Sequence, residues 1–166
     1  DRVTAFESSS GNTWISWGEI ALEVYSSSGT KLGTWDNFEF PIREIIEYDG
    51  LILFATEDGV ERFNETSFSW ESTWTPGNGL PNNMGDWVGE LWTDGTHLVV
   101  GSATFAGWGG FQRGVVGHLD GSTGTWSTFN TGQNGVPNGY PLSMNTCGSY
   151  LYIGLFNNNG GVMYMD

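Results

Sequence analysis

Residues 94–102 have the sequence DGTHLVVGS, which is a tight turn followed by an apolar run. Asp-Gly next to an apolar run is a strong signal for a β-hairpin, because both residues tolerate positive φ angles. A turn followed by a short apolar run recurs at three other places in the chain. The four runs cover residues 13–17, 52–56, 98–102 and 151–155. They follow one another at intervals of about 40–55 residues, so the chain is built from a repeat.

Each apolar run is the second strand of a predicted unit of four short strands. The first strands are expected at residues 3–6, 43–48, 87–93 and 142–146. The third strands are expected at residues 20–25, 59–63, 115–119 and 161–165. A Thr-Trp pair marks a fourth strand in three of the units, at Trp35, Trp74 and Trp126. The last unit has no such pair, so we expect it to be incomplete.

A repeated unit of four strands is typical of a β-propeller blade, which buries its faces against neighbouring blades. We therefore predict an all-β propeller of antiparallel blades that forms one segment over residues 1–166. The blades are expected at about residues 1–40, 41–84, 85–139 and 140–166. The three repeated Trp residues are expected to pack between blades. Gly is 26 of the 166 residues and aromatic residues make up 15%, which favours strands and turns over helices or disorder.

The unit resembles a known kind of repeat. Residues 118–126 have the sequence HLDGSTGTW, and two nearly identical loops have the sequences NGLPNN at 78–83 and NGVPNG at 134–139. This pattern resembles the blades of two-component-regulator-type propellers and the related quinoprotein-type repeat over nearly the whole chain. The first unit departs from it, with SSSG at 26–29 and no Asn-Gly-Leu-Pro loop. The resemblance implies an extracytoplasmic sensor, scaffold or secreted protein, but it specifies a blade and not an activity.

The charge of the chain limits its partners. Nineteen acidic and five basic residues give a net charge of −14. A nucleic-acid binder needs cations to replace phosphate counterions, and anionic membranes also attract cations, so both partners are disfavoured. No apolar run is long enough for membrane insertion. The acidic surface suits cationic or neutral, sugar-like partners, and an extracellular or cell-surface location is expected.

An incomplete last unit would leave sheet edges and blade faces uncovered, which invites association. The partners are therefore expected to be other protein subunits or further blades of the same protein. Three arrangements stay open, of which the first is favoured. The chain is part of a propeller of about six to eight blades, or two copies pair into a ring of about eight, or it closes alone as a ring of four.

Loops on one face of the disc form the predicted binding site. If the first strand of each unit is innermost, the loops after the second and fourth strands share a face, and long loops on a rigid scaffold often bind ligands. The predicted binding residues are Trp108, Phe111 and Arg113 in a long loop at 103–113, with Asn82, Asn83 and Asn138. An exposed Trp can stack on a sugar ring or anchor a protein, although Trp108 can equally fold back as a plug. Asn64 begins a glycosylation triplet.

Few features of the sequence indicate catalysis or a cofactor. Two groups of acidic residues could supply the paired carboxylates of a glycoside-cleaving enzyme, although such groups also arise by chance in an acidic chain. They are Glu44, Glu47 and Asp49, and Asp86, Glu90 and Asp94. His97 and His118 lie in different strands without a metal-ligand spacing, so no transition-metal site and no cofactor are expected. Ca²⁺ held by residues 157–159 or by Asp120 stays open as a weaker alternative.

The sequence therefore favours a non-enzymatic β-propeller that serves as a binding or assembly scaffold outside the cell or at its surface. It would contact proteins or glycans through loops on a disc face. Two alternatives remain: a polysaccharide hydrolase or lyase with acidic residues at the centre of the disc, and a sensor ectodomain.

Overall fold

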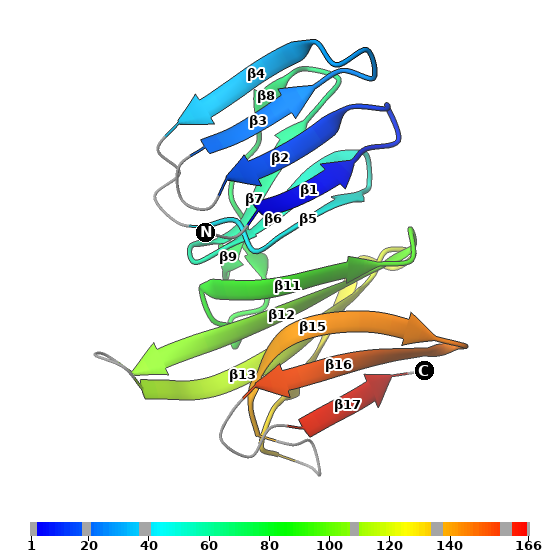
Figure 1. The fold of residues 1–166 in the computed structure, drawn as a ribbon. Helices are drawn as coiled ribbons and strands as arrows, with labels where there is room; N and C mark the ends of the chain where they lie inside the picture. The colour runs from blue at the N-terminus through cyan, green and yellow to red at the C-terminus, as the bar shows by residue number, and fades with distance from the viewer. Residues whose placement is uncertain are drawn as a thin grey trace.

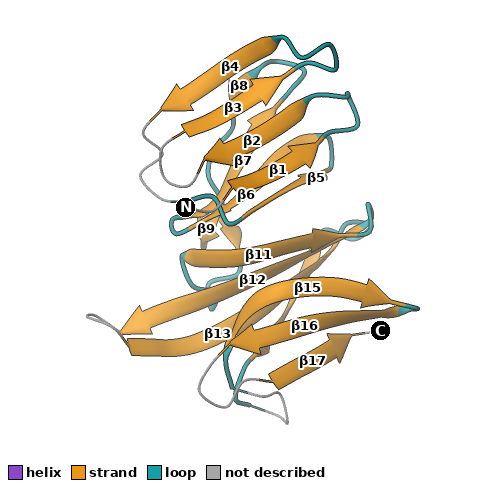
Figure 2. Cartoon of the chain, viewed as in Figure 1, coloured by secondary structure: helices purple, strands orange, loops and turns teal. Residues whose placement is uncertain are grey.

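The computed structural model describes residues 3–17, 21–36, 41–106, 110–133, 138–156 and 161–165. Of residues 105, 106 and 110–112 it describes the backbone alone. These parts of the chain consist of strands, turns and connecting segments (Figure 2). The described residues include no helix long and apolar enough to cross a membrane.

Four antiparallel sheets follow one another along the chain (Figure 1). The first sheet contains β1 (Val3–Glu7), β2 (Thr13–Trp17), β3 (Ala21–Tyr25) and β4 (Lys31–Asp36). The second contains β5 (Glu44–Tyr48), β6 (Leu51–Thr56), β7 (Gly59–Asn64) and β8 (Ser69–Trp70). The third contains β11 (Trp87–Thr93), β12 (His97–Ala106), β13 (Gly110–Asp120) and β14 (Thr125–Asn130). The fourth contains β15 (Tyr140–Cys147), β16 (Tyr150–Phe156) and β17 (Gly161–Met165).

Within each sheet the strands pair in chain order, which confirms the predicted all-β fold of antiparallel units. Three predicted strands, at 13–17, 87–93 and 161–165, have the bounds that the structure gives to β2, β11 and β17. The predicted Asp-Gly turn between β5 and β6 is also present. Asp49 and Gly50 there have φ angles of 51° and 73°, which only a few residue types adopt at low cost.

Two local predictions were wrong. Residues 103–106 and 110–113 are not a loop, because β12 and β13 stay paired as far as Ala106 and Gly110, with a bulge after Thr104. Antiparallel pairing needs only backbone groups, so Gly110 can take part in it. The fourth strand of the second sheet does not form around Trp74. It lies at Ser69–Trp70, and Trp74 makes an isolated bridge to Val60, while Thr75–Pro76 (β9) and Gly79–Leu80 (β10) form a short parallel pair.

The hydrophobic core is divided into three clusters, each between two consecutive sheets. Trp14 of the first sheet is fully buried and contacts Phe54 and Phe63 of the second, with ring centroids 5.4 and 4.9 Å apart. Leu53 and Val60 of the second sheet pack on the third, and Val99 of the third packs on the fourth. Because successive side chains on a strand point to opposite faces, each middle sheet buries both of its faces.

The repeated Trp residues pack between sheets, but not at one equivalent position. Trp35 packs in the cluster between the first and second sheets, so it faces the following sheet. Trp74 likewise faces the following sheet, whereas Trp126 of the third sheet faces the preceding one in the same cluster. The equivalent of Trp126 in the second sheet is Trp70. Each is the second paired residue of the fourth strand of its sheet: Trp126 is paired with Leu119, and Trp70 is paired with Phe63.

Each junction between sheets also carries a polar contact. Glu65, directly after β7, accepts a hydrogen bond of 2.7 Å from the indole Nε1 of buried Trp14. Tyr48 donates to the backbone oxygen of Thr96 at 3.2 Å, and the backbone N–H of Met144 donates to Glu90 at 3.3 Å. Directional bonds of this kind fix how one sheet lies on the next.

The described residues form an open row of sheets. None of the three hydrophobic clusters joins the fourth sheet to the first. Figure 1 shows the two sheets at opposite ends of the molecule. The outer faces of both end sheets carry large exposed side chains, among them Trp17 on β2 and Tyr152 and Tyr164 on the fourth sheet.

Candidate functional site

Part of the predicted binding face is occupied by contacts within the protein. The guanidinium of Arg113 donates to the backbone oxygen of Asn83 at 2.8 Å. The side-chain amide of Asn83 in turn donates to Thr128 Oγ1 at 2.9 Å. Arg113 and Asn83 therefore lie together as predicted, but these contacts link β13 and β14 to the segment that leads into β11.

Of the other residues predicted for this face, the structure describes two side chains. Asn82 and Asn138 are exposed, in the connections ahead of the third and fourth sheets. Trp108 lies outside the described residues, as does the side chain of Phe111. Asn64 lies at the end of β7, where its side-chain oxygen accepts from the backbone of Thr66 at 2.9 Å. Binding at this face and glycosylation of Asn64 stay predictions.

Two of the acidic residues named above bond to other parts of the protein. Glu47 accepts two hydrogen bonds from Ser9, at 2.6 Å from its backbone nitrogen and 2.5 Å from its hydroxyl. Glu90 is buried and accepts from Met144. Among the described residues no group of three or more His, Cys, Asp or Glu side chains is placed to hold a metal ion. Asp120 bonds to Ser122, and residues 157–159 lie outside the described parts.

A cavity of 380 Å³ lies between the third and fourth sheets, at the end where the β11–β12 and β15–β16 turns meet. Its volume falls within the range of small-molecule pockets. The third sheet contributes the side chains of Trp92, Asp94, His97, Val99 and His118. The fourth sheet contributes residues Thr146, Gly148, Ser149, Tyr150, Leu151 and Met165. The wall thus combines two imidazoles, the indole of Trp92 and the hydroxyl groups of Thr146 and Ser149.

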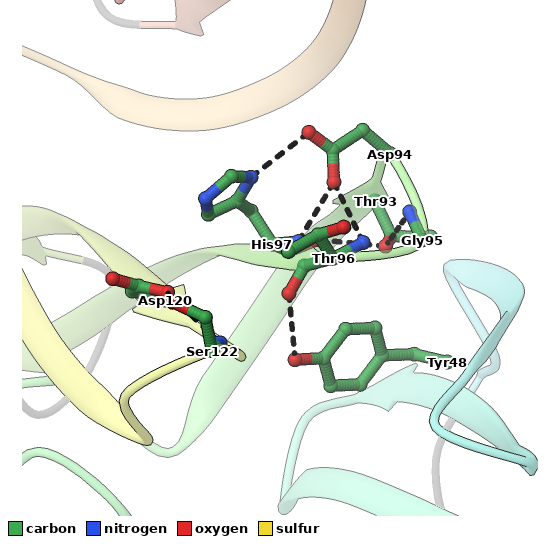
Figure 3. A network of polar contacts seen from close by, with 8 residues as sticks. All are labelled: Tyr48, Thr93, Asp94, Gly95, Thr96, His97, Asp120 and Ser122. Atoms are coloured by element: carbon green, nitrogen blue, oxygen red, sulfur yellow. Dashed lines mark hydrogen bonds and ion pairs between the residues drawn. The ribbon is translucent and has the colours of Figure 1, made fainter.

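Asp94 fixes the orientation of His97, which lines this cavity, and Figure 3 shows the contacts between the two residues. One carboxylate oxygen accepts from the backbone N–H groups of Thr96 and His97 at 2.8 and 2.7 Å. The other lies 2.9 Å from Nδ1 of His97. Burial opposes ionisation of Asp94, but the hydrogen bonds from His97 and Thr96 outweigh it and bring its pKa to about 2. An ionised carboxylate only accepts, so Nδ1 of His97 carries the proton and Nε2 is left for a ligand.

His118 reaches the same cavity from the neighbouring strand. In the sheet register it lies opposite Val99, diagonal to His97, and the two imidazole rings stack with centroids 5.2 Å apart. Burial of His118 lowers its pKa, and the charge of His97 acts in the same direction. The hydrogen bond to Asp94 raises the pKa of His97. Over the interval between the two pKa values, one imidazole is a charged donor and the other is neutral.

Sequence reasoning missed this site, because it treated His97 and His118 as unrelated residues of different strands. The signal was available in the hairpin register. The strands predicted at 98–102 and 115–119 are antiparallel neighbours. His97 directly precedes the first of them and His118 is the last residue but one of the second, so the pairing puts both side chains on one face of the sheet. The predicted Asp94-Gly95 turn also placed a carboxylate three residues before His97.

The chain matches no protein-family model, and no curated protein matches it in sequence. Solved structures resemble it in fold. The computationally designed protein Ika4 has a TM-score of 0.65 at 11% identity, over 99% of this chain and 91% of Ika4. The Pan2 WD40 domain of Neurospora crassa has a TM-score of 0.56 at 10% identity, over 98% of this chain and 61% of that domain.

A third similar structure is the extracellular domain of a protein described as a hybrid two-component system of B. thetaiotaomicron. Its TM-score is 0.71 at 17% identity, and the match covers 98% of this chain and 21% of that chain. The chain thus spans about a fifth of the length of that extracellular-domain chain, and nearly all of Ika4. WD40 domains are β-propellers. Consecutive four-stranded antiparallel sheets that stack face to face, together with these likenesses, give the fold class of the chain as a β-propeller.

Proposed function

We propose that the chain is a ligand-binding segment of an extracellular or cell-surface β-propeller, and that it acts as a binding scaffold rather than as an enzyme. The observation that carries this proposal is the cavity between the third and fourth sheets, with the oriented imidazole of His97 in its wall. The fold likeness to an extracellular domain of a two-component system supports the location. The sequence of residues 118–126 supports a repeat of the two-component-regulator type, and a sensor ectodomain is then the specific form of the function.

The chemistry of the cavity suits a neutral sugar unit. Asp94 is ionised near neutral pH, since hydrogen bonds from His97 and Thr96 outweigh burial and bring its pKa to about 2, and the chain carries a net charge of −14. An anionic ligand is therefore repelled. Sugar hydroxyls both donate and accept, which matches imidazole nitrogens and the hydroxyls of Thr146 and Ser149, and a sugar ring can lie against an aromatic side chain.

The test is an isothermal calorimetric titration of the chain with neutral oligosaccharides from plant, bacterial and fungal polysaccharides. Replacing His97 or Ser149 with Ala is expected to weaken binding about tenfold, since each removes a hydrogen-bonding group worth about 1–1.5 kcal/mol. Asn82→Ala, on the predicted loop face, is the control for these two variants. Binding that depends on Asn82 and not on His97 would move the site to the loop face, and no binding of any neutral sugar would remove the glycan from the proposal.

A further inference from the structure

The two end faces of the row of sheets carry the positions that form the three junctions between sheets inside the chain. Four positions of the second strands are equivalent by the repeat: Trp14, Leu53, Val99 and Tyr152. The first three are buried against the following sheet, with exposed fractions of 0, 0 and 1%. Tyr152 has no following sheet among the described residues and is 40% exposed.

The opposite face follows the same rule. Phe54, Val100 and Ile153 are fully buried against the preceding sheet, and their equivalent in the first sheet is Ile15. Ile15 points away from the second sheet, on the same face as Trp17, which is 46% exposed. The first sheet therefore shows the outer face that the other three sheets use to pack on their predecessors.

A charged residue on this first face does not prevent packing. Ile15 is paired with Glu23, and in the second sheet the equivalent pair is Phe54 with Glu61. Glu61 faces the first sheet beside that core and is bonded by Thr73 Oγ1 at 2.9 Å. Glu23 is likewise bonded, by Lys31, Tyr25 and Trp17. A sheet with this Glu position already packs on another within the chain.

The outer face of the fourth sheet is uncharged and rich in Tyr. Tyr150, Tyr152 and Tyr164 contact one another there, with ring centroids 5.5 to 6.5 Å apart. The remaining described residues of this face on β16 and β17 are Gly154, Phe156 and Val162. Tyr side chains combine a large apolar area with a hydroxyl that needs a partner when it is buried, which suits a protein contact.

The geometry points to a second copy of this chain as the occupant, with the Tyr face of one copy packed on the Ile15 face of the other. The Tyr hydroxyls can donate to the carboxylates of the Ile15 face, which include Glu7, Glu23 and Asp36 on the same side of the first sheet. Pairing two Ile15 faces would instead oppose like charges, which is destabilising. The contact is therefore head to tail.

A single head-to-tail contact between two copies leaves one Tyr face and one Ile15 face free. Such a contact closes into a ring if the rotation allows it and otherwise adds further copies. Two copies with four sheets each give eight sheets, which is within the usual size of closed propellers of about four to eight blades. The test of this inference is separate from that of the proposed ligand, because the substituted residues Ile15 and Tyr152 do not line the cavity between the third and fourth sheets, although Tyr150 borders both the cavity and the Tyr face.

The experiment is sedimentation and light scattering of the 166-residue chain over a range of concentrations. We expect a dimer of about 36 kDa, twice the 18.2 kDa of one chain, or larger head-to-tail assemblies. Ile15→Asp and Tyr152→Asp are each expected to give monomers, because every contact needs one face of each kind. Phe129→Asp is the matched control, since Phe129 is 39% exposed but lies on β14 of the third sheet.

Mixing the Ile15→Asp and Tyr152→Asp variants is the decisive experiment. One intact face remains on each variant, so the mixture is expected to form a one-to-one dimer that neither variant forms alone. Circular dichroism and thermal melting show that each variant is folded. A wild-type chain that stays monomeric at high concentration would overturn the inference. So would a dimer that Tyr152→Asp abolishes and Ile15→Asp leaves intact, because that dimer would pair two Tyr faces.

Discussion

The imidazole rings of His97 and His118 are stacked, with 29° between their planes, although the two residues are 21 positions apart in the sequence. They belong to neighbouring strands and face the same cavity, yet their surroundings shift their pKa values in opposite directions. The hydrogen bond to Asp94 raises the pKa of His97, whereas burial and the charge of His97 lower the pKa of His118. A pair of this kind can be examined directly by titration.

We predict that His97 loses its proton at a higher pH than His118 in an NMR titration of the imidazole signals. A raised folded-state pKa means that the His97–Asp94 pair stabilises the fold below pH 6.5 and that this stabilisation is lost as the pH rises through the His97 pKa. Lowering of the His118 pKa has the opposite sign, so that its protonation destabilises the fold as the pH falls below 6.5. Asp94→Asn is expected to lower the pKa of His97. Titration in the reverse order would contradict the stacked arrangement with Asp94 on His97.

The first junction between sheets should depend on Trp14. Trp14→Ala removes a fully buried indole that contacts Phe54 and Phe63, and the expected loss in free energy of unfolding is about 3–5 kcal/mol. Phe129→Ala is the comparison, because truncation of an exposed side chain usually changes stability by less than about 0.5 kcal/mol. Urea denaturation of the dilute chain measures both. Similar losses for the two variants would mean that the cluster around Trp14 is not the core of this junction.

Glu65 should make this junction sensitive to acid. Burial opposes its ionisation, but hydrogen bonds from Ser10, Trp14, Asn12 and Ser8 outweigh burial and lower its pKa. Stabilisation by the carboxylate is therefore present above about pH 4.5 and is lost as the pH falls through the lowered pKa. Glu65→Ala leaves the indole N–H of Trp14 without its acceptor and is expected to cost about 1–3 kcal/mol.

The matched variant for this prediction is Glu65→Gln, which keeps an oxygen acceptor but cannot titrate. Its unfolding free energy should lose less than that of the Ala variant, and its profile below pH 4.5 should be flatter than that of the wild type. An unchanged acid profile in Glu65→Gln would assign the acid sensitivity to other carboxylates. Thermal melts at several pH values separate these outcomes.

Two glycines allow backbone strain and steric overlap to be measured separately. Gly50 has a φ of 73° with open space around an added Cβ, so Gly50→Ala is expected to cost only the strain of about 1–2 kcal/mol. Gly59 has a φ of 120°, and an added Cβ would lie 2.2 Å from the backbone oxygen of Trp74. Gly59→Ala should therefore cost clearly more, because it also breaks the bridge between Val60 and Trp74. Equal losses in denaturant titrations would show that the bridge adds nothing.

The sequence was sufficient to predict the repeat, because hairpin turns and alternating apolar residues are local features. The β5–β6 turn at Asp49-Gly50 and the bounds of β2, β11 and β17 follow from such features. The extended β12–β13 hairpin was not predictable in this way, since the glycines of residues 103–113 signal a loop, whereas the described residues up to Ala106 and from Gly110 are paired. The position of β8 also depends on packing, because Trp70 and Trp74 are both plausible strand residues and only the neighbouring sheets distinguish them.

The candidate site was harder to predict for a related reason. Side chains of two sheets meet there, and the sequence does not state how far one sheet is shifted along the next. The pairing of His97 with Asp94 was within reach of turn geometry, but the approach of Ser149 and Tyr150 from the fourth sheet was not. Arg113 and Asn83 are in contact, and the hydrogen bonds described for them are made with the protein itself.

Asp94 performs two tasks with one carboxylate, since it bonds to the backbone of the β11–β12 turn and also holds the ring of His97. Substitutions at Asp94 would therefore change ligand preference and turn stability together, which makes this half of the pocket costly to alter during evolution. The facing half includes Ser149 of the β15–β16 turn, which belongs to a different hairpin, so a change there leaves the bonds of Asp94 in place. Divergence of specificity among copies of this repeat is then expected to accumulate on the β15–β16 turn, while the Asp-Gly turn opposite it stays the same.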